Sequence, residues 1–215
     1  IIMKIKFLLL LTISSFIFNG CGQKKDNKAV SKHVKHFPLS TGDYTVNAGE
    51  SKLIWTGKEV STKKHYGTIN IKNGRISINN DGMINGDIEI DMPTINTTDL
   101  QGRGKQKLDG HLKSPDFFDV NQYPTAYLKF QGNEKKLSNG QLKFDGQLTI
   151  KDITHPISFT SDIKDSDGKL TANAVVIFDR SLYDVRFRSG RFFKNLGDKL
   201  IYDDISVDVL IVSSK

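Results

Sequence analysis

The sequence is poor in cysteine and has no long apolar run. Its 215 residues contain a single cysteine, Cys21, so the chain cannot form an internal disulfide. The longest predominantly apolar stretch is residues 7–18, which is too short to cross a bilayer as a helix. These absences exclude a disulfide-stapled scaffold and a protein with several membrane-spanning helices. The hydrophobic share of 37% suits one globular domain of about 150 to 200 residues.

The motifs of the common enzyme classes are also missing. There is no Gly-x-Ser-x-Gly elbow, no phosphate-binding loop and no dinucleotide fingerprint. The five histidines are scattered, without the spacing that places two metal ligands on one helical face. We therefore predict that the protein is not an enzyme and has no catalytic residues, metal site or cofactor. Asp87, Glu89 and Asp91 alternate along one strand face and are expected to face solvent, although a hydrolase using two of them stays open.

The positive charge is concentrated near the N-terminus. The chain has a formal charge of +7, but residues 41–215 contain 24 basic and 23 acidic side chains. A nucleic-acid-binding domain needs a basic surface on its folded body. The near-neutral body therefore argues against nucleic acid as a partner.

Residues 1–20 have the composition of a secretory signal peptide. Two lysines precede the apolar stretch 7–18. The junction Gly20-Cys21-Gly22 resembles a bacterial lipoprotein cleavage box, which implies that Cys21 is acylated and is the lipid-attachment site. Each buried CH₂ of an acyl chain contributes about 0.8 kcal/mol, so several chains hold a protein on a membrane without a spanning helix. The alternative is plain secretion with Cys21 as a free thiol.

Residues 21–42 then follow as a flexible tether, and residues 43–215 form the folded body. The tether is rich in lysine and has few large apolar side chains, which is typical of a solvated linker. We expect a lipid-anchored protein of the bacterial cell envelope, held at the outer membrane on its periplasmic or surface face.

Apolar residues in the body recur at every second position, as in Leu142/Phe144 and Leu148/Ile150. This period indicates strands with one buried face. Two-residue pairs that favour positive φ lie between several of these runs and predict antiparallel hairpins. These pairs are Asn73-Gly74, Asp81-Gly82, Asn139-Gly140 and Asp167-Gly168. We count eight to ten strands, and strands this long and numerous favour closure into a barrel, because closure removes exposed edges.

One segment, residues 97–113, breaks the strand pattern. It is mostly polar, and Leu108 and Leu112 are spaced to share a helical face. Gly102 and Gly104 weaken its first half, so we expect a short helix beginning near Lys105. Its two leucines are expected to plug one end of the barrel.

Several stretches of the body carry a family resemblance. The most specific is residues 111–126, which begin with HLKSPDFFDV and end with YPTA. The others are residues 146–157 (GQLTI to HPI), residues 178–184 (FDR to YD) and residues 203–209 (DDISVDV). Together they resemble the YceI-like family of secreted polyisoprenoid-binding proteins. Asp152 and Asp184 stand where many relatives have glycine, and an acylated Cys21 resembles a lipoprotein branch of this family.

The resemblance implies an all-β fold, an antiparallel eight-stranded lipocalin-like barrel with a short helix capping one end. It also implies an apolar cavity that holds one polyisoprenoid chain, either a carrier lipid or a quinone tail. The alternation selects inward side chains as cavity candidates, although such residues more often simply fill a core. The candidates are Trp55, Ile69, Ile71, Ile88, Ile90, Phe130, Phe144 and Phe159.

Four of the six arginines lie between residues 180 and 191. Guanidinium groups fork onto phosphate oxygens, so Arg186 and Arg188 are candidates for contact with a lipid head group at the barrel mouth. The alternative is a rim of surface salt bridges with neighbouring aspartates. Gly190 and Gly197 predict a long loop here that forms a lid.

The leading hypothesis is a membrane-anchored lipid-binding protein whose partners are an isoprenoid lipid or quinone and the membrane. A packed barrel that serves as an envelope interaction or stress module without a ligand is the first alternative. An enzyme acting on lipid head groups is the second, weaker alternative. The sequence leaves a homodimer open.

Overall fold

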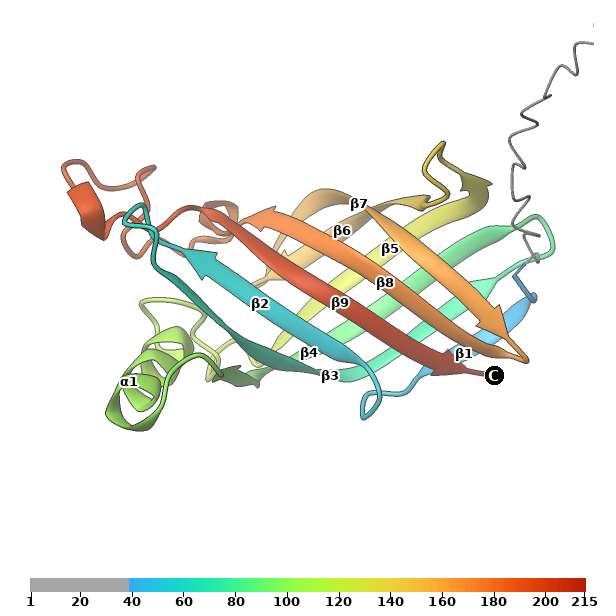
Figure 1. Ribbon diagram of the computed structural model, residues 1–215, viewed down its shortest axis with the longest axis horizontal. Helices are drawn as coiled ribbons and strands as arrows, with labels where there is room; N and C mark the ends of the chain where they lie inside the picture. The colour runs from blue at the N-terminus through green and yellow to red at the C-terminus, as the bar shows by residue number, and fades with distance from the viewer. Residues whose placement is uncertain (1–38) are drawn as a thin grey trace, which may run out of the picture. The chain divides into compact units, whose positions relative to one another are not determined.

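The computed structural model describes residues 39–215, apart from the side chains of residues 134 and 136. The predicted signal peptide, Cys21 and most of the predicted tether lie outside the described residues. The described part contains nine strands, one α-helix and two short 3-10 helices (Figure 1). They are β1 (Gly42–Val46), β2 (Lys52–Lys58), β3 (Lys64–Ile78), β4 (Met83–Thr97), α1 (Gly102–Lys113), β5 (Thr125–Lys136), β6 (Leu142–Ile150), β7 (Ile153–Ser166), β8 (Lys169–Asp179), η1 (Arg180–Tyr183), η2 (Gly197–Lys199) and β9 (Asp204–Ser214).

The strands form one closed antiparallel barrel. Neighbours follow the order β3-β2-β9-β8-β7-β6-β5-β4, and β4 pairs with β3 again. β1 and β2 both lie between β3 and β9, one after the other, so the nine strands occupy eight positions around the barrel. The prediction of an all-β, eight-stranded lipocalin-like barrel with one short helix is confirmed.

Three of the four turn pairs predicted from sequence connect strands. Gly82, Gly140 and Gly168 have φ values of 72°, 86° and 79°, as such turns require. The prediction for Asn73-Gly74 is wrong, because this pair lies inside the 15-residue strand β3. A Cβ on Gly74 would stand 2.7 Å from Ile88 on β4, so this glycine permits close packing of β3 on β4.

Two other turns use aspartate in a left-handed conformation. Asp152, between β6 and β7, has a φ of 59°, and Asp184, after η1, has a φ of 58°. The family resemblance of the sequence leads us to expect glycine at these two positions. Aspartate adopts the left-handed region of positive φ more readily than most residues, so both turns form without glycine.

The helix α1 covers one end of the barrel, as expected, but it begins at Gly102 rather than near Lys105. Gly102 has a φ of +55°, which glycine adopts at no steric cost, so the chain turns into the helix at this residue. The Asp109 carboxylate accepts a hydrogen bond of 2.7 Å from the Thr97 amide at the end of β4. No helix among residues 39–215 has the length and apolar character needed to span a membrane.

The two ends of the barrel differ. α1 and the segment between η1 and β9 lie at one end, which we call the mouth (Figure 1). β1 and the C-terminus lie at the other end. That end is filled by fully or nearly fully buried side chains, namely Tyr44, Ile84, Leu142 and Leu170.

Candidate functional site

The barrel encloses a cavity of about 310 Å³ whose wall is almost entirely apolar. Inward positions of the strands supply most of the wall, because alternate side chains of a barrel strand point to its interior. Seven of the eight cavity candidates from the sequence lie on this wall: Trp55, Ile69, Ile88, Ile90, Phe130, Phe144 and Phe159. The eighth, Ile71, is buried beside an irregularity in the β3–β4 register and does not line the cavity.

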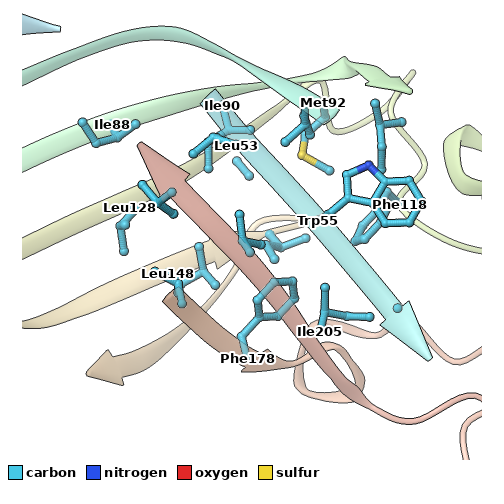
Figure 2. Close-up of a pocket in the computed structure, with 18 of the residues that line it drawn as sticks. Leu53, Trp55, Ile88, Ile90, Met92, Phe118, Leu128, Leu148, Phe178 and Ile205 are labelled. Atoms are coloured by element: carbon cyan, nitrogen blue, oxygen red, sulfur yellow. The ribbon is translucent and has the colours of Figure 1, made fainter. Parts of the chain in front are cut away.

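Trp55 lies on the side of the cavity nearest the mouth (Figure 2). Its indole Nε1 donates a hydrogen bond of 3.3 Å to the backbone carbonyl of Thr68 on β3. A Cβ on Gly67 would stand 2.7 Å from the indole ring, so this glycine makes room for it. Figure 2 also shows Met92 and Phe118 near this ring. The indole is thereby held in the cavity wall.

Three phenylalanines form an aromatic cluster farther into the barrel. The ring centroids of Phe130, Phe144 and Phe159 lie 5.3 to 5.5 Å from one another. Gly86 and Gly146 flank Phe130 in the register, and a Cβ on Gly86 would stand 2.0 Å from the Phe130 ring. The missing side chain of Gly86 is what allows this ring to lie over β4. A Cβ on Gly146 would instead stand 2.3 Å from the backbone oxygen of Lys129, so this glycine permits close packing of β6 on β5.

Sequence reasoning missed two groups of wall residues. Ala172 and Ala174 on β8 continue the period-two pattern, but their small side chains gave no apolar signal. The other group comes from outside the strands, where alternation gives no guidance: Phe117, Phe118, Phe187 and Ile201. Leu108 and Leu112 were predicted to plug this end, and the structure places both on the cavity wall.

Apart from Ser161 on β7, the polar side chains of the wall gather at the mouth. They are Lys58, Glu59, His65, His111 and Arg188. His65 Nδ1 lies 2.8 Å from the Asp99 carboxylate, which satisfies that ring nitrogen. His111 Nε2 is buried and has no hydrogen-bond partner among the described residues. Its ring packs edge-on against Phe187, with 4.3 Å between the centroids.

The arginine cluster separates into paired and unpaired members. Arg180 is fully buried and pairs with Asp203, Arg186 pairs with Asp184, and Arg191 lies 3.5 Å from Asp179. These three arginines therefore form salt bridges with neighbouring aspartates, which was the alternative to head-group contact. Arg188 is half-buried and has no acidic partner within residues 39–215, so among these four it is the arginine that lines the cavity without a salt bridge.

Residues 184–203, which we call the mouth loop, connect η1 to β9. Phe187, Arg188 and Ile201 of this loop line the cavity. Phe192 and Phe193 do not, and instead face solvent with 40% and 48% of their surface exposed. The two ends of the loop therefore contribute to the cavity wall, and its phenylalanine pair does not.

The described residues contain no group of three His, Cys, Asp or Glu side chains close enough to hold a metal ion. The alternating carboxylates of β4 lie on the outer face of the barrel. Asp87 and Glu89 pair there with Lys129 and Lys72, at 3.3 and 3.8 Å.

A closed antiparallel barrel with an apolar internal cavity open at one end defines a lipocalin-like binding fold. The YceI-like domain family model matches residues 44–213, which is most of the chain. The chain therefore belongs to the YceI-like domain family.

Solved structures of distant relatives share the fold. BcnA of Burkholderia cenocepacia is 17% identical with a TM-score of 0.58, and the match covers 78% of this chain and 98% of BcnA. A polyisoprenoid-binding domain of Saccharophagus degradans, implicated in plant cell wall breakdown, is 13% identical with a TM-score of 0.58, covering 80% and 97%. The YCEI protein of Campylobacter jejuni is 17% identical with a TM-score of 0.51, covering 95% and 99%. No curated protein sequence matches the chain.

Proposed function

We propose that this protein binds the hydrocarbon chain of an isoprenoid lipid inside the barrel and holds it without catalysing a reaction. The observation that carries the proposal is the apolar cavity, whose wall offers methyl, methylene and aromatic groups along most of the barrel. The polyisoprenoid-binding relative from Saccharophagus degradans supports the choice of ligand. A packed barrel without a ligand, the main alternative from the sequence, would leave no such space.

The cavity volume limits how much of the chain is buried. A cavity of about 150 Å³ lined by apolar side chains is enough to hold benzene. A cavity of about 310 Å³ therefore holds about twice that, or roughly twelve carbons, which is two to three isoprene units. Each buried CH₂ contributes about 0.8 kcal/mol, so this segment binds without any charged partner. The rest of a longer chain lies at the mouth.

The polar groups at the mouth suit the oxygen atoms of a lipid head group. Arg188 brings an unpaired guanidinium, and the buried His111 Nε2 lacks a partner that a head-group oxygen or hydroxyl would supply. Arg186, the other candidate from the sequence, is exposed and already paired with Asp184. We therefore assign head-group contact to Arg188 and His111.

Anchoring through an acylated Cys21 and a location at the outer membrane belong to the same proposal. They rest on the lipoprotein-like junction in the sequence. Mass spectrometry of the protein purified from a bacterial membrane tests them, with a diacylated or triacylated Cys21 at the N-terminus as the expected result.

Trp55 provides the test of ligand binding, because it is the only tryptophan and lines the cavity. Farnesol, farnesyl phosphate and a short-chain prenyl quinone are titrated while its fluorescence is recorded. We expect saturable binding of all three. Replacing Arg188 with Gln is expected to weaken farnesyl phosphate binding about tenfold or more and to leave farnesol within about twofold. Absence of saturable binding by every one of the three would overturn the proposal.

A further inference from the structure

The mouth loop carries an exposed pair of aromatic side chains beside the cavity opening. Phe192 and Phe193 have 40% and 48% of their surface exposed, and every residue from Arg191 to Asn195 is exposed. Large apolar side chains at a loop tip gain nothing from water, so a neighbouring pair of them indicates a contact with another surface.

The charges around this pair are mostly positive. The exposed charged residues of the mouth loop are Arg186, Arg191, Lys194, Lys199 and Asp198. Arg186 and Arg191 are paired with Asp184 and Asp179, whereas the two lysines have no acidic partner within residues 39–215. Arg186 also lies over the ring of Phe192, with 5.1 Å between the guanidinium carbon and the ring centroid. An exposed aromatic tip with a basic surround is the combination found in segments that sit at an anionic membrane surface.

The loop between β2 and β3 extends the same surface. Val60 has 40% of its surface exposed, and its amide donates a hydrogen bond of 3.0 Å to the Leu200 carbonyl of the mouth loop. Lys63 and Lys64 beside it are exposed. The two loops therefore present one surface, which we call the rim, around the cavity opening.

A prenyl chain also needs a route to the cavity that avoids water. Such a chain resides in a bilayer, and leaving it costs about 0.8 kcal/mol for every CH₂ exposed to water. The cavity wall reaches Lys58, Glu59 and Arg188 at the mouth, next to the rim. The mouth is the end of the barrel opposite β1 (Figure 1). A bilayer in contact with the rim would place its lipids directly at the mouth.

We propose that the rim docks on an anionic lipid bilayer, with Phe192 and Phe193 inserted among the head groups and the exposed lysines Lys194 and Lys199 contacting lipid phosphates. The inference rests on the proposed function, since it gives the route by which the barrel takes up or releases its lipid. It assigns the contact to the barrel itself, separately from any acyl anchor.

The test uses the barrel unit, residues 37–215, which forms its own compact unit and contains every strand and the whole described core. It is sedimented with vesicles of phosphatidylcholine alone or of phosphatidylcholine with roughly 30% phosphatidylglycerol, because an anionic surface attracts basic segments. We expect binding to the anionic vesicles that weakens as salt is raised. The double variant Phe192→Ala/Phe193→Ala is expected to lose at least about tenfold in affinity, and Lys194→Gln/Lys199→Gln a similar amount.

The matched control is Val175→Ala/Ile177→Ala, which removes two outward side chains of the barrel wall that are 54% and 56% exposed. It is expected to bind vesicles as the parent does. Equal loss in this control, or no loss in the phenylalanine variant, would overturn the proposal. So would sedimentation velocity showing that Phe192 and Phe193 instead hold two copies of the chain together.

Trp55 titration with farnesol in solution separates this proposal from the proposed function. The phenylalanine variant is expected to bind farnesol as the parent does, because neither ring lines the cavity. Vesicle binding without farnesol binding would retain the rim and reject the lipid cavity. Farnesol binding without vesicle binding would retain the lipid cavity and reject docking of the rim on a bilayer.

Discussion

The guanidinium of Arg180 lies 3.2 Å from the carboxylate of Asp203, joining the two ends of the mouth loop. Arg180 is fully buried and also donates hydrogen bonds to the carbonyls of Val185, Ile201 and Tyr202. Asp203 in turn accepts a hydrogen bond of 2.9 Å from the Ser189 hydroxyl. A single arginine therefore fixes both ends of the loop that lines the opening, which is a structural role rather than a ligand-binding one.

Removing the charge of Asp203 is expected to destabilise the protein. Burial lowers the pKa of Arg180, and the carboxylates of Asp203 and Asp179 oppose that shift, so the guanidinium depends on its acidic partners. Leaving a buried charge unpaired costs about 3–5 kcal/mol, and the partial exposure of Asp203 puts the expected loss for Asp203→Asn at the lower end. Urea unfolding of the variant and the parent measures this change in the free energy of unfolding. The matched control Asp204→Asn, at an exposed neighbour, is expected to change the free energy of unfolding by less than about 0.5 kcal/mol.

Filling the cavity is expected to abolish lipid binding while keeping the fold. Ala174 lines the cavity from β8, so Ala174→Phe places a ring in the space for the chain. The expected result is at least about a tenfold loss of farnesol affinity in the Trp55 titration, since several buried carbons are displaced. Val175→Phe, at the adjacent outward position, is the control and should bind as the parent does. Unchanged farnesol affinity in Ala174→Phe would place the ligand elsewhere.

Affinity is expected to depend on prenyl chain length only until the cavity is filled. Each additional buried carbon contributes about 0.8 kcal/mol, or roughly fourfold in affinity. The cavity of about 310 Å³ accommodates two to three isoprene units, by comparison with an apolar cavity of about 150 Å³ that holds benzene. Titration of prenyl alcohols should therefore show a steep rise up to roughly fifteen carbons and a plateau beyond. A continued rise at longer chains would mean that the barrel opens further on binding.

Stability is expected to fall at alkaline pH because of Tyr183. Burial raises the pKa of the Tyr183 phenol to about 12, and the Asp179 carboxylate contributes to the rise. The phenol of the unfolded chain ionises near its ordinary pKa of about 10. Below pH 10 the phenol is neutral in both states, so the free energy of unfolding is not reduced by Tyr183. Between pH 10 and 12 the phenol ionises in the unfolded chain but not in the folded protein, which lowers the free energy of unfolding by about 2–3 kcal/mol in all.

Denaturant unfolding at several pH values compares Tyr183→Phe with the parent. The variant should lose less stability than the parent between pH 10 and 12. Tyr202→Phe, at an exposed tyrosine, should behave as the parent. Identical pH profiles for the parent and Tyr183→Phe would contradict the assignment.

Much of this fold was predictable from the sequence, because each barrel strand alternates between a buried and an exposed face. That pattern identified seven wall residues of the cavity and the closure of the sheet. It failed at Asn73-Gly74, where a turn-forming pair lies inside a strand because tight packing against Ile88 requires glycine. Local turn preference was overridden there by contact with a neighbouring strand.

The mouth was less predictable, because it is built from contacts between distant segments. His111 from α1 meets Phe187 from the mouth loop, and no periodicity relates the two. The division of the arginines into paired and unpaired members likewise depends on how the mouth loop folds back onto Asp203. Composition indicated a basic loop, but only the structure separates Arg188 at the cavity from Arg180 in the core.

Native mass spectrometry of the protein purified from a bacterial host, before and after organic extraction, tests the central claim most directly. The account predicts a bound species that is removed by extraction and identified as an isoprenoid lipid, and its absence from Ala174→Phe. A protein that keeps the mass of its bare chain before extraction, and again after incubation with prenyl lipids, would contradict the account.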